Sequence, residues 1–373
     1  MELKKIKLHI ASYIYDRLYD IKNFYLQLKA ILFNNIKGMT TYEGHSLKQK
    51  IEESLDLFLT EEQKKDKLYI NKISRDITLC AIRYKTTPFD YFLLGFNTIN
   101  TNKESRKKFV TDKFKDDLLI KYDGWENYLE LNDKFGLYEK ISSFYKRELF
   151  KFTSKTNRQD FINFACRIND LFIKPNSSSY GNGAMVKYIK TAQEANCLYD
   201  FLIKNGDDWL IEERIIQHDS MAAWNKSSVN TIRYITCLNK NGLFTLTPIL
   251  RTGRKGSIID NTGGGGIFAN IDLVTGKIYT NGIDKLGNVY TEHPDSNIKF
   301  LDWKVPQWEE LKMLAENIHL NYMSHHIYIG WDFAFSEKGW CLIEGNWAQF
   351  GSQMVDKKGR KEEFISYIKP GKV

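Results

Sequence analysis

Three side chains near the C-terminus have the types and the spacing of a site for a hard cation. Asp332 lies in the run IGWDFAF, and Glu344 and Asn346 lie in the run CLIEGNW. Both runs have the composition of strands, and segment 336–339 between them has the character of a hairpin turn, so we expect an antiparallel pair. Residues two apart share a strand face, which puts Glu344 and Asn346 on one side. Carboxylate and amide oxygens suit Mg²⁺ better than zinc, so we predict a magnesium site here.

A lysine followed by a small, flexible loop is a second candidate. Lys174 lies near the end of the strand-like run DLFIKP, and the uncharged loop after it includes Ser178, Ser179, Gly181 and Gly183. Backbone N–H groups of such a loop can approach phosphate oxygens closely, while the ammonium group supplies positive charge. No G-K-[ST] sequence ends the loop, so it is not a P-loop. An ordinary surface loop is the alternative interpretation.

Charged residues inside strand-like runs mark two further candidates. Glu212 and Glu213 follow the apolar residues of WLIEERII, where a carboxylate can bind an adenine amino group or a ribose hydroxyl. Surface charges on an edge strand are the alternative. In TIRYITCL, alternation places Thr231 and Arg233 on one face, and Arg251 lies on the following strand. Guanidinium groups suit bidentate contacts with phosphate or carboxylate, and a buried structural ion pair is the alternative.

The elements that must position these side chains change in character along the chain. In residues 1–128, apolar residues recur at three- and four-residue spacing, as in Ile70, Ile73 and Ile77, which is typical of amphipathic helices. In residues 129–373, short β-branched and aromatic runs alternate with two helical stretches, TAQEANCLYDFLIKN and VPQWEELKMLAENIHLNY. We therefore predict a mainly helical N-terminal region followed by an α+β region.

Composition excludes several classes of protein. The chain has 373 residues, 42% hydrophobic and 27% charged, which is the balance of a soluble globular protein. No apolar run approaches the roughly 18 residues of a membrane span. The five cysteines are scattered without a C-x-x-C pair, which predicts a reducing, cytoplasmic location. The histidines show no ligand spacing, and we treat the adjacent His325 and His326 as structural because neighbours face opposite ways in a strand.

The net charge of +8 is concentrated at the N-terminus. Residues 1–50 hold nine Lys or Arg and four Asp or Glu, a net charge of +5. A basic start interleaved with apolar residues can make weak peripheral contact with the anionic inner face of a membrane. A helix face that is solvated or packed on the rest of the chain is the alternative. The basic residues form no long stripe and no nucleic-acid motif is present, so we predict no nucleic-acid partner.

Taken in order along the chain, these motifs resemble an ATP-grasp nucleotide-binding fold, and more narrowly the sugar-transfer-associated ATP-grasp family. The runs that carry the resemblance are VNTIRYIT, GGGGIFANID, HPDSNIKFLDWKVPQW and GWDFAFSEKGWCLIEGNW. The resemblance covers about residues 90–350. It implies an α+β fold in which two α+β subdomains within 129–373 clasp ATP, preceded by the mainly helical region 1–128.

The resemblance also implies a role for each candidate residue. ATP contacts are implied at Lys134, Lys174, Ser178, Ser179, Gly181, Gly183 and Glu212, with Glu213 as the alternative register for the adenine-side carboxylate. The implied Mg²⁺ ligands are Asp332, Glu344 and Asn346. Arg233 and Arg251 are implied to bind the γ-phosphate or an acyl phosphate.

The implied reaction is ATP- and Mg²⁺-dependent joining of a carboxylate to an amine through an acyl phosphate, on small-molecule or sugar-linked substrates of cell-surface polysaccharide assembly. A phosphotransferase acting on a sugar hydroxyl needs the same ATP site and a general base, for which Asp260 and His293 are candidates. A nucleotide-binding module without catalysis is a third hypothesis. The presence of both lysines and all three metal ligands argues against that third hypothesis.

Overall fold

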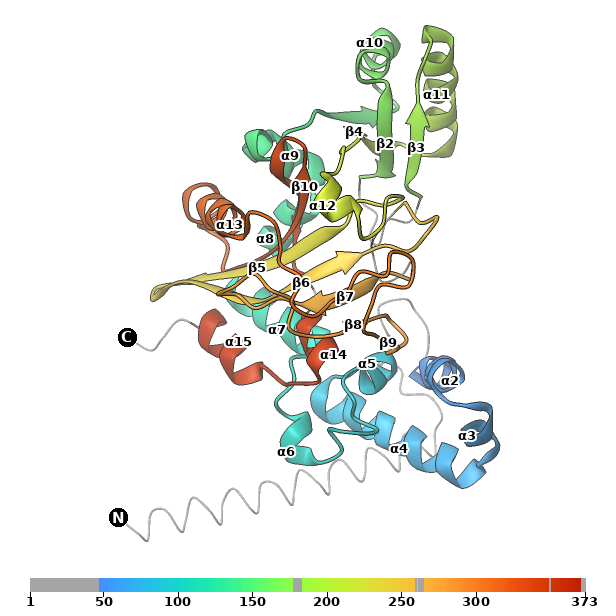
Figure 1. Cartoon of the computed structure of the whole chain (residues 1–373), viewed down its shortest axis with the longest axis vertical. Coiled ribbons are helices and arrows are strands. Elements are labelled where there is room, and N and C mark those ends of the chain that lie inside the picture. Colours follow the sequence, from blue (N-terminus) through green and yellow to red (C-terminus); the bar gives the residue numbers. More distant parts are fainter. Residues whose placement is uncertain (1–46, 177–182, 259, 261–264, 349, 370–373) are drawn as a thin grey trace. The chain divides into compact units, whose positions relative to one another are not determined.

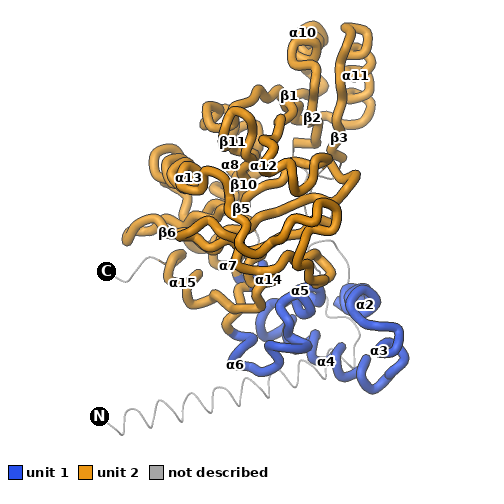
Figure 2. The backbone as a smooth tube through the Cα atoms, in the orientation of Figure 1, with its two compact units in different colours: residues 1–107, 111–114 blue, residues 108–110, 115–373 orange. Residues whose placement is uncertain are grey.

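The computed structural model of the protein describes residues 47–176, 183–258, 260, 265–348 and 350–369. They form two compact units (Figure 2), one within Met1–Lys107 and Thr111–Phe114, the other within Lys108–Val110 and Lys115–Val373. The pattern predicted to touch a membrane lies almost entirely outside the described residues and stays a prediction. Within the described ranges, no helix has the length and hydropathy needed to cross a bilayer.

The described part of the first unit is helical, as the apolar spacing predicts. Asp66 caps the longest described helix of this unit by accepting hydrogen bonds from two of its first amides, and that helix buries Ile73 and Ile77. Arg106 donates hydrogen bonds to the two carboxylate oxygens of Asp76 at 2.7 and 2.6 Å. This ion pair links two helices that are far apart in the sequence. The described helices are α2 (Leu47–Phe58), α3 (Glu61–Lys65), α4 (Lys67–Tyr84), α5 (Pro88–Leu93) and α6 (Lys103–Arg106).

The second unit contains two antiparallel sheets with helices against each, so the predicted α+β architecture is confirmed (Figure 1). The smaller sheet has the strand order β1-β4-β2-β3. Helices α10 and α11 cover it and bury an aromatic core that includes Phe152, Phe161 and Trp209. Its elements are β1 (Leu149–Thr153), α10 (Arg158–Ile168), β2 (Asp170–Pro175), β3 (Met185–Tyr188), α11 (Ala192–Asn205) and β4 (Asp208–Glu213).

The larger sheet has seven strands in the order β11-β10-β5-β6-β7-β8-β9. The strands predicted from TIRYITCL, IGWDFAF and CLIEGNW, and the strand predicted to carry Arg251, are all present in it. Its strands are β5 (Thr231–Asn239), β6 (Gly242–Thr252), β7 (Ile267–Asn270), β8 (Gly282–Ile283), β9 (Val289–Tyr290), β10 (Tyr328–Ser336) and β11 (Gly339–Asn346).

Helices α13 (Trp308–Tyr322) and α15 (Lys361–Ile368) cover opposite faces of the larger sheet. His319 of α13 bonds to Thr236 Oγ1 at 2.7 Å, whereas Phe364 of α15 packs on Tyr328, the strand partner of Cys237. Consecutive strand residues such as Thr236 and Cys237 face opposite ways, which assigns the two faces.

The remaining described helices of the second unit are α8 (Trp125–Asn132), α9 (Lys134–Ile141), the 3₁₀ helix η1 (Ser142–Phe144), α12 (Asp219–Ala222) and α14 (Ser352–Asp356). Helix α7 (Asp112–Tyr122) begins in the first unit and ends in the second. The predicted start of the ATP-grasp region at residue 129 falls inside α8 and stays a prediction.

Candidate active site

A β-bulge in the β10–β11 hairpin determines which side chains face one another. Up to Leu342 the strands pair regularly from the turn, but the next pair is Asp332 with Glu344, so Ile343 is an extra residue. In a regular hairpin from the same turn, Glu344 would lie opposite Trp331 and face the other side of the sheet. The bulge therefore places Glu344 and Asp332 on one face.

Two arginines bind the carboxylate of Asp332. Arg233 lies opposite Asp332 in the sheet and pairs with both of its oxygens, and Arg251 Nη1 donates to Asp332 Oδ2 at 3.0 Å. Burial acts to raise the pKa of Asp332, but the two guanidinium groups outweigh it and hold the pKa below its ordinary value. Arg251 also contacts Asp260 at 3.3 Å, and the Thr231 hydroxyl donates to that carboxylate. A buried ion pair was the alternative to phosphate or carboxylate binding by Arg233, and this ion pair is present.

The three predicted metal ligands lie together and keep oxygens for a cation. Asp332 Oδ2 accepts two hydrogen bonds, from Arg233 at 2.8 Å and Arg251 at 3.0 Å, whereas Oδ1 accepts one from Arg233. A carboxylate oxygen has two lone pairs, so Oδ1 retains one. Glu344 accepts from Asn346 Nδ2 at 3.1 Å through Oε1, which leaves Oε2 to a ligand. An all-oxygen set of this kind fits the preference of Mg²⁺.

On the smaller sheet, Lys174 and Glu212 form a buried ion pair. Lys174 Nζ lies 2.6 Å from Glu212 Oε1, and the Glu212 side chain is only 4% exposed. Burial acts to raise the pKa of Glu212, but Lys174 and Arg147 outweigh it and hold the pKa at about 2. Both oxygens of Glu212 thus lie against cationic groups, and the adenine contact expected of this residue stays a prediction.

Arg147 is a site residue that the sequence did not reveal. Its Nε and Nη2 donate to Glu212 Oε2 at 2.9 and 2.6 Å, and its Nη1 donates to the Leu342 carbonyl at 2.6 Å. Leu342 directly precedes the bulge residue Ile343, so one guanidinium group joins β4 of the smaller sheet to the bulge in the larger. The only sequence signal is a Lys-Arg pair before an apolar run, which is too common to identify a site.

Lys134 interacts electrostatically with Glu344 of the predicted metal site and with the Lys174–Glu212 ion pair. It begins α9, and its Nζ donates to the Asn176 carbonyl at 3.2 Å. Burial lowers the pKa of Lys134, with Glu344 acting to raise it and Lys174 to lower it. The amine is therefore within electrostatic reach of the predicted metal ligands and of the second lysine.

The other predicted contacts are only partly within the described residues. Glu213 pairs with Lys338 at 3.0 Å, in the turn of the β10–β11 hairpin. Gly183 has a φ of +78°, a left-handed conformation that suits glycine, and an added Cβ would lie 3.2 Å from Pro175. The predicted contacts at Ser178, Ser179 and Gly181 lie outside the described residues.

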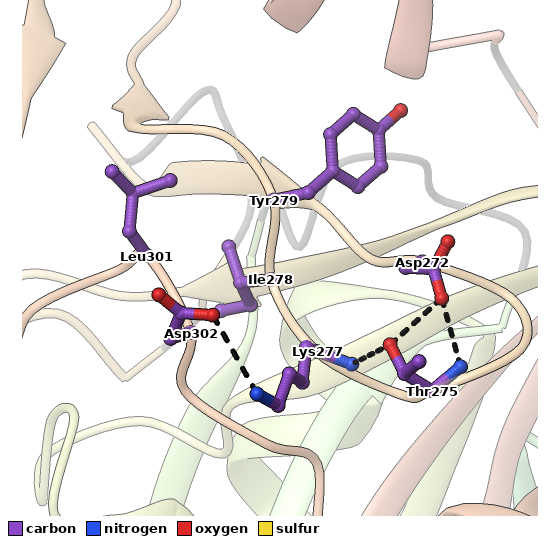
Figure 3. A pocket seen from close by; sticks show the side chains of 7 residues that line it. All are labelled: Asp272, Thr275, Lys277, Ile278, Tyr279, Leu301 and Asp302. Atoms are coloured by element: carbon purple, nitrogen blue, oxygen red, sulfur yellow. Dashed lines mark hydrogen bonds and ion pairs between the residues drawn. The ribbon is translucent and has the colours of Figure 1, made fainter.

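A hollow of about 480 Å³ lies elsewhere on the second unit (Figure 3). Its walls come from the turn after β7 and the segment before α13, and none of the predicted site residues lines it. Four of its polar side chains pair with one another, since Thr275 bonds to Asp272 at 2.7 Å and Lys277 lies 3.6 Å from Asp302. The lining residues are Asp272, Thr275, Lys277, Ile278, Tyr279, Leu301 and Asp302.

Solved structures with a similar chain path share little sequence with this protein. D-alanyl-alanine synthetase A from Vibrio cholerae is 11% identical with a TM-score of 0.39, over 66% of this chain and 64% of the other. D-alanine–D-alanine ligase from Bacillus anthracis is 13% identical with a TM-score of 0.36, over 64% of each chain. The Helicobacter pylori ligase is 15% identical with a TM-score of 0.37, over 65% and 62%. This chain thus spans less than two thirds of each, and no curated protein matches it.

A comparison with protein-family models matches residues 100–366 to the sugar-transfer associated ATP-grasp family. The matched range covers both predicted lysines, both arginines and all three predicted metal ligands. It begins within the first compact unit and extends through both sheets. The protein therefore belongs to the sugar-transfer associated ATP-grasp family, as the order of its motifs predicts.

Proposed function

We propose that this protein is an ATP- and Mg²⁺-dependent ligase that joins a carboxylate to an amine through an acyl phosphate, in the modification of cell-surface polysaccharide. One observation carries the proposal: Arg233, Asp332 and Glu344 lie opposite one another across β5, β10 and β11. Arg251 binds the same carboxylate from β6. Fixed cationic donors beside hard oxygen ligands are what phosphoryl transfer from ATP requires.

We assign Lys134 and Lys174 to the phosphate oxygens of ATP. Glu212, held between Lys174 and Arg147, fixes the position of the Lys174 ammonium group and does not read the adenine base. A lysine held in this way loses less side-chain freedom when it binds phosphate, which favours binding. The adenine contact then passes to Glu213 or to the backbone that follows it.

The metal would be held by Asp332, Glu344 and Asn346, and Mg²⁺ when bound neutralises phosphate charge and polarises the γ-phosphoryl group. Arg233 and Arg251 supply further positive charge to the transferred phosphoryl oxygens. Their guanidinium groups are oriented by Asp332, so they need little reorganisation during the reaction.

In the proposed reaction, a carboxylate oxygen of the first substrate attacks the γ-phosphorus and ADP leaves. The amine nitrogen of the second substrate then attacks the acyl carbon, the C–O bond to phosphate breaks, and the amine gives up a proton. Asp260 is our candidate for the proton acceptor, because burial raises its pKa although Arg251 acts to lower it. The Thr231 hydroxyl holds that carboxylate in place.

Product mass after incubation with ATP, Mg²⁺ and mixed sugar acids and amines tests this function. The expected product is an amide, formed with one ADP and one phosphate. Hydroxylamine in place of the amine is expected to trap the acyl phosphate as a hydroxamate. Consumption of ATP without either product would contradict the ligase proposal.

Phosphoryl transfer to a sugar hydroxyl is a second candidate, favoured by one observation. A carboxylate with a raised pKa beside two arginines, as at Asp260, also suits removal of a hydroxyl proton. The same product analysis separates the candidates, because this reaction yields a phosphorylated sugar and ADP without free phosphate.

Replacing Lys174 with methionine is expected to weaken ATP binding by about 10- to 100-fold, the value of a hydrogen bond between charged groups. Glu212 keeps Arg147 as a partner, so the variant is expected to stay folded. Calorimetric titration with a non-hydrolysable ATP analogue measures the change. Lys204→Met, at an exposed lysine in α11, is the control, and equal affinity in the two variants would remove Lys174 from the site.

A further inference from the structure

A cluster of one glutamate and two histidines lies outside the site described above. Glu130 belongs to α8, and His325 and His326 lie in the turn that precedes β10. From the sequence we predict that the two histidines are structural, because neighbouring residues in a strand face opposite ways. In the turn, however, both Nε2 atoms approach Glu130 Oε2, His325 at 2.7 Å and His326 at 3.2 Å.

The three side chains have the dimensions of a metal site. Each offers one ligand atom, and these atoms all lie within 4.8 Å of one another. With metal–ligand bonds of about 2.0–2.1 Å, neighbouring ligand atoms of a tetrahedral zinc site lie about 3.3 Å apart. The separation between Glu130 Oε2 and His326 Nε2, 3.2 Å, is close to that value, and the separation between Glu130 Oε2 and His325 Nε2, 2.7 Å, is shorter. Since all three atoms lie within 4.8 Å of one another, a local adjustment of the side chains would let them face one ion.

The surroundings of the cluster favour a partly open site. Lys140 pairs with Glu130 Oε1, which holds the carboxylate and leaves Oε2 toward the histidines. The His326 side chain is fully buried, and that of Glu130 is 17% exposed. The His325 side chain is 51% exposed, so water can reach a remaining coordination position.

We propose that Glu130, His325 and His326 form a binding site for a divalent transition metal ion of the zinc type, separate from the magnesium site. Two imidazole nitrogens and one carboxylate oxygen are ligands that zinc accepts, whereas Mg²⁺ prefers oxygen alone. The proposal does not depend on the reaction assigned to the ATP site.

One feature limits the affinity of this site. His326 Nδ1 is buried and has no hydrogen-bond partner among the described atoms. When Nε2 binds a metal, the imidazole proton must be on Nδ1, where most zinc-binding histidines have an acceptor. Loss of such a partner weakens metal binding by about 10- to 100-fold, so we expect a site weaker than a fully supported zinc centre.

The bound ion would join α8 to the start of β10. His326 lies six residues before Asp332 along the chain, in the segment that leads into β10. Asp123 already fixes this turn by accepting the Ile327 amide at 2.6 Å. Glu130 already contacts both histidines of this turn, and a metal would strengthen that link, so we expect it to stabilise the fold without taking part in chemistry.

Titration of the chelator-treated full chain with Zn²⁺, in saturating Mg²⁺ and without ATP, tests the site. We expect zinc to bind and to raise the melting temperature, since a ligand of the folded state stabilises it. Glu130→Gln and His325→Asn are expected to weaken zinc binding by about 100-fold and to abolish the thermal shift. With Co²⁺ as a probe, imidazole ligation is expected to give visible absorption bands that the same variants lose.

Matched variants make the outcome decisive. His218→Asn replaces an exposed histidine outside the cluster while keeping a side chain that can cap α12, and it is expected to bind zinc normally. Glu344→Gln is expected to bind zinc normally too, because the two sites share no ligand. Zinc held by the exposed Cys166 or Cys197 would survive in His325→Asn. Absence of zinc binding in the wild type, or equal binding by His325→Asn, overturns the proposal.

Discussion

Replacing Glu344 with glutamine is expected to reduce Mg²⁺-dependent ATP turnover by about three orders of magnitude while leaving the fold intact. Glu344 would supply a charged metal ligand, and loss of metal stabilisation at the transferred phosphoryl group costs several kcal/mol, each ~1.4 kcal/mol being tenfold in rate. The side chain is half-buried and opposite Asp332, so an isosteric amide keeps the packing. Release of ADP at saturating ATP measures the loss, and urea unfolding checks the fold.

The same hairpin offers a control for this variant. Glu337 is exposed in the β10–β11 turn, and Glu337→Gln is expected to keep wild-type turnover. Raising the Mg²⁺ concentration is expected to recover part of the activity of Glu344→Gln, because a weakened ligand set binds the ion at higher concentration. Wild-type turnover by folded Glu344→Gln would refute the metal assignment.

Replacing Arg147 with methionine is expected to lower the free energy of unfolding by about 3 kcal/mol or more, because removing one partner leaves a buried charge poorly compensated. The Arg147 side chain is 3% exposed, and it pairs with Glu212, which is 4% exposed. The change also removes the hydrogen bond to the Leu342 carbonyl beside the bulge, so we expect weaker ATP binding as well. Urea unfolding and calorimetry measure the two effects.

An exposed ion pair between α10 and the residue that precedes β1 serves as the control. Arg167 pairs with Glu148, and their side chains are 57% and 49% exposed, so Arg167→Met is expected to cost less than about 1 kcal/mol. Similar losses in Arg147→Met and Arg167→Met would show that burial does not matter at Arg147.

Acid pH gives a further test of the Arg147 pair. The pKa of Glu212 is held at about 2 in the folded chain, against an ordinary value of 4.5. The unfolded chain therefore takes up the proton first, and the stability contributed by Glu212 is complete above about pH 4.5 and is lost as the pH falls toward 2. With Arg147 replaced, the folded pKa rises and this acid dependence becomes shallower. An identical acid dependence in the wild type and Arg147→Met would contradict the assigned pair.

The helices, the strands and the residues capable of chemistry could be predicted from the amino-acid sequence alone. Alternation and turn residues predicted the strands that carry Lys174, Arg233 and Asp332, because strand formation depends on neighbours along the chain. The order of the motifs was enough to indicate the family, which the match over residues 100–366 confirms.

Which of these side chains contact one another depends on how distant segments of the chain pack together. One extra residue, Ile343, shifts the pairing of β11 and turns Glu344 toward Asp332, and such a register change depends on the partner strand. Arg147 contacts residues 65 and 195 positions away, so no local pattern could mark it. His325 and His326 converge because the chain turns before β10, where the alternation of a strand does not apply. Contacts between distant segments follow from packing the whole chain, whereas periodicity records only the face that each segment buries.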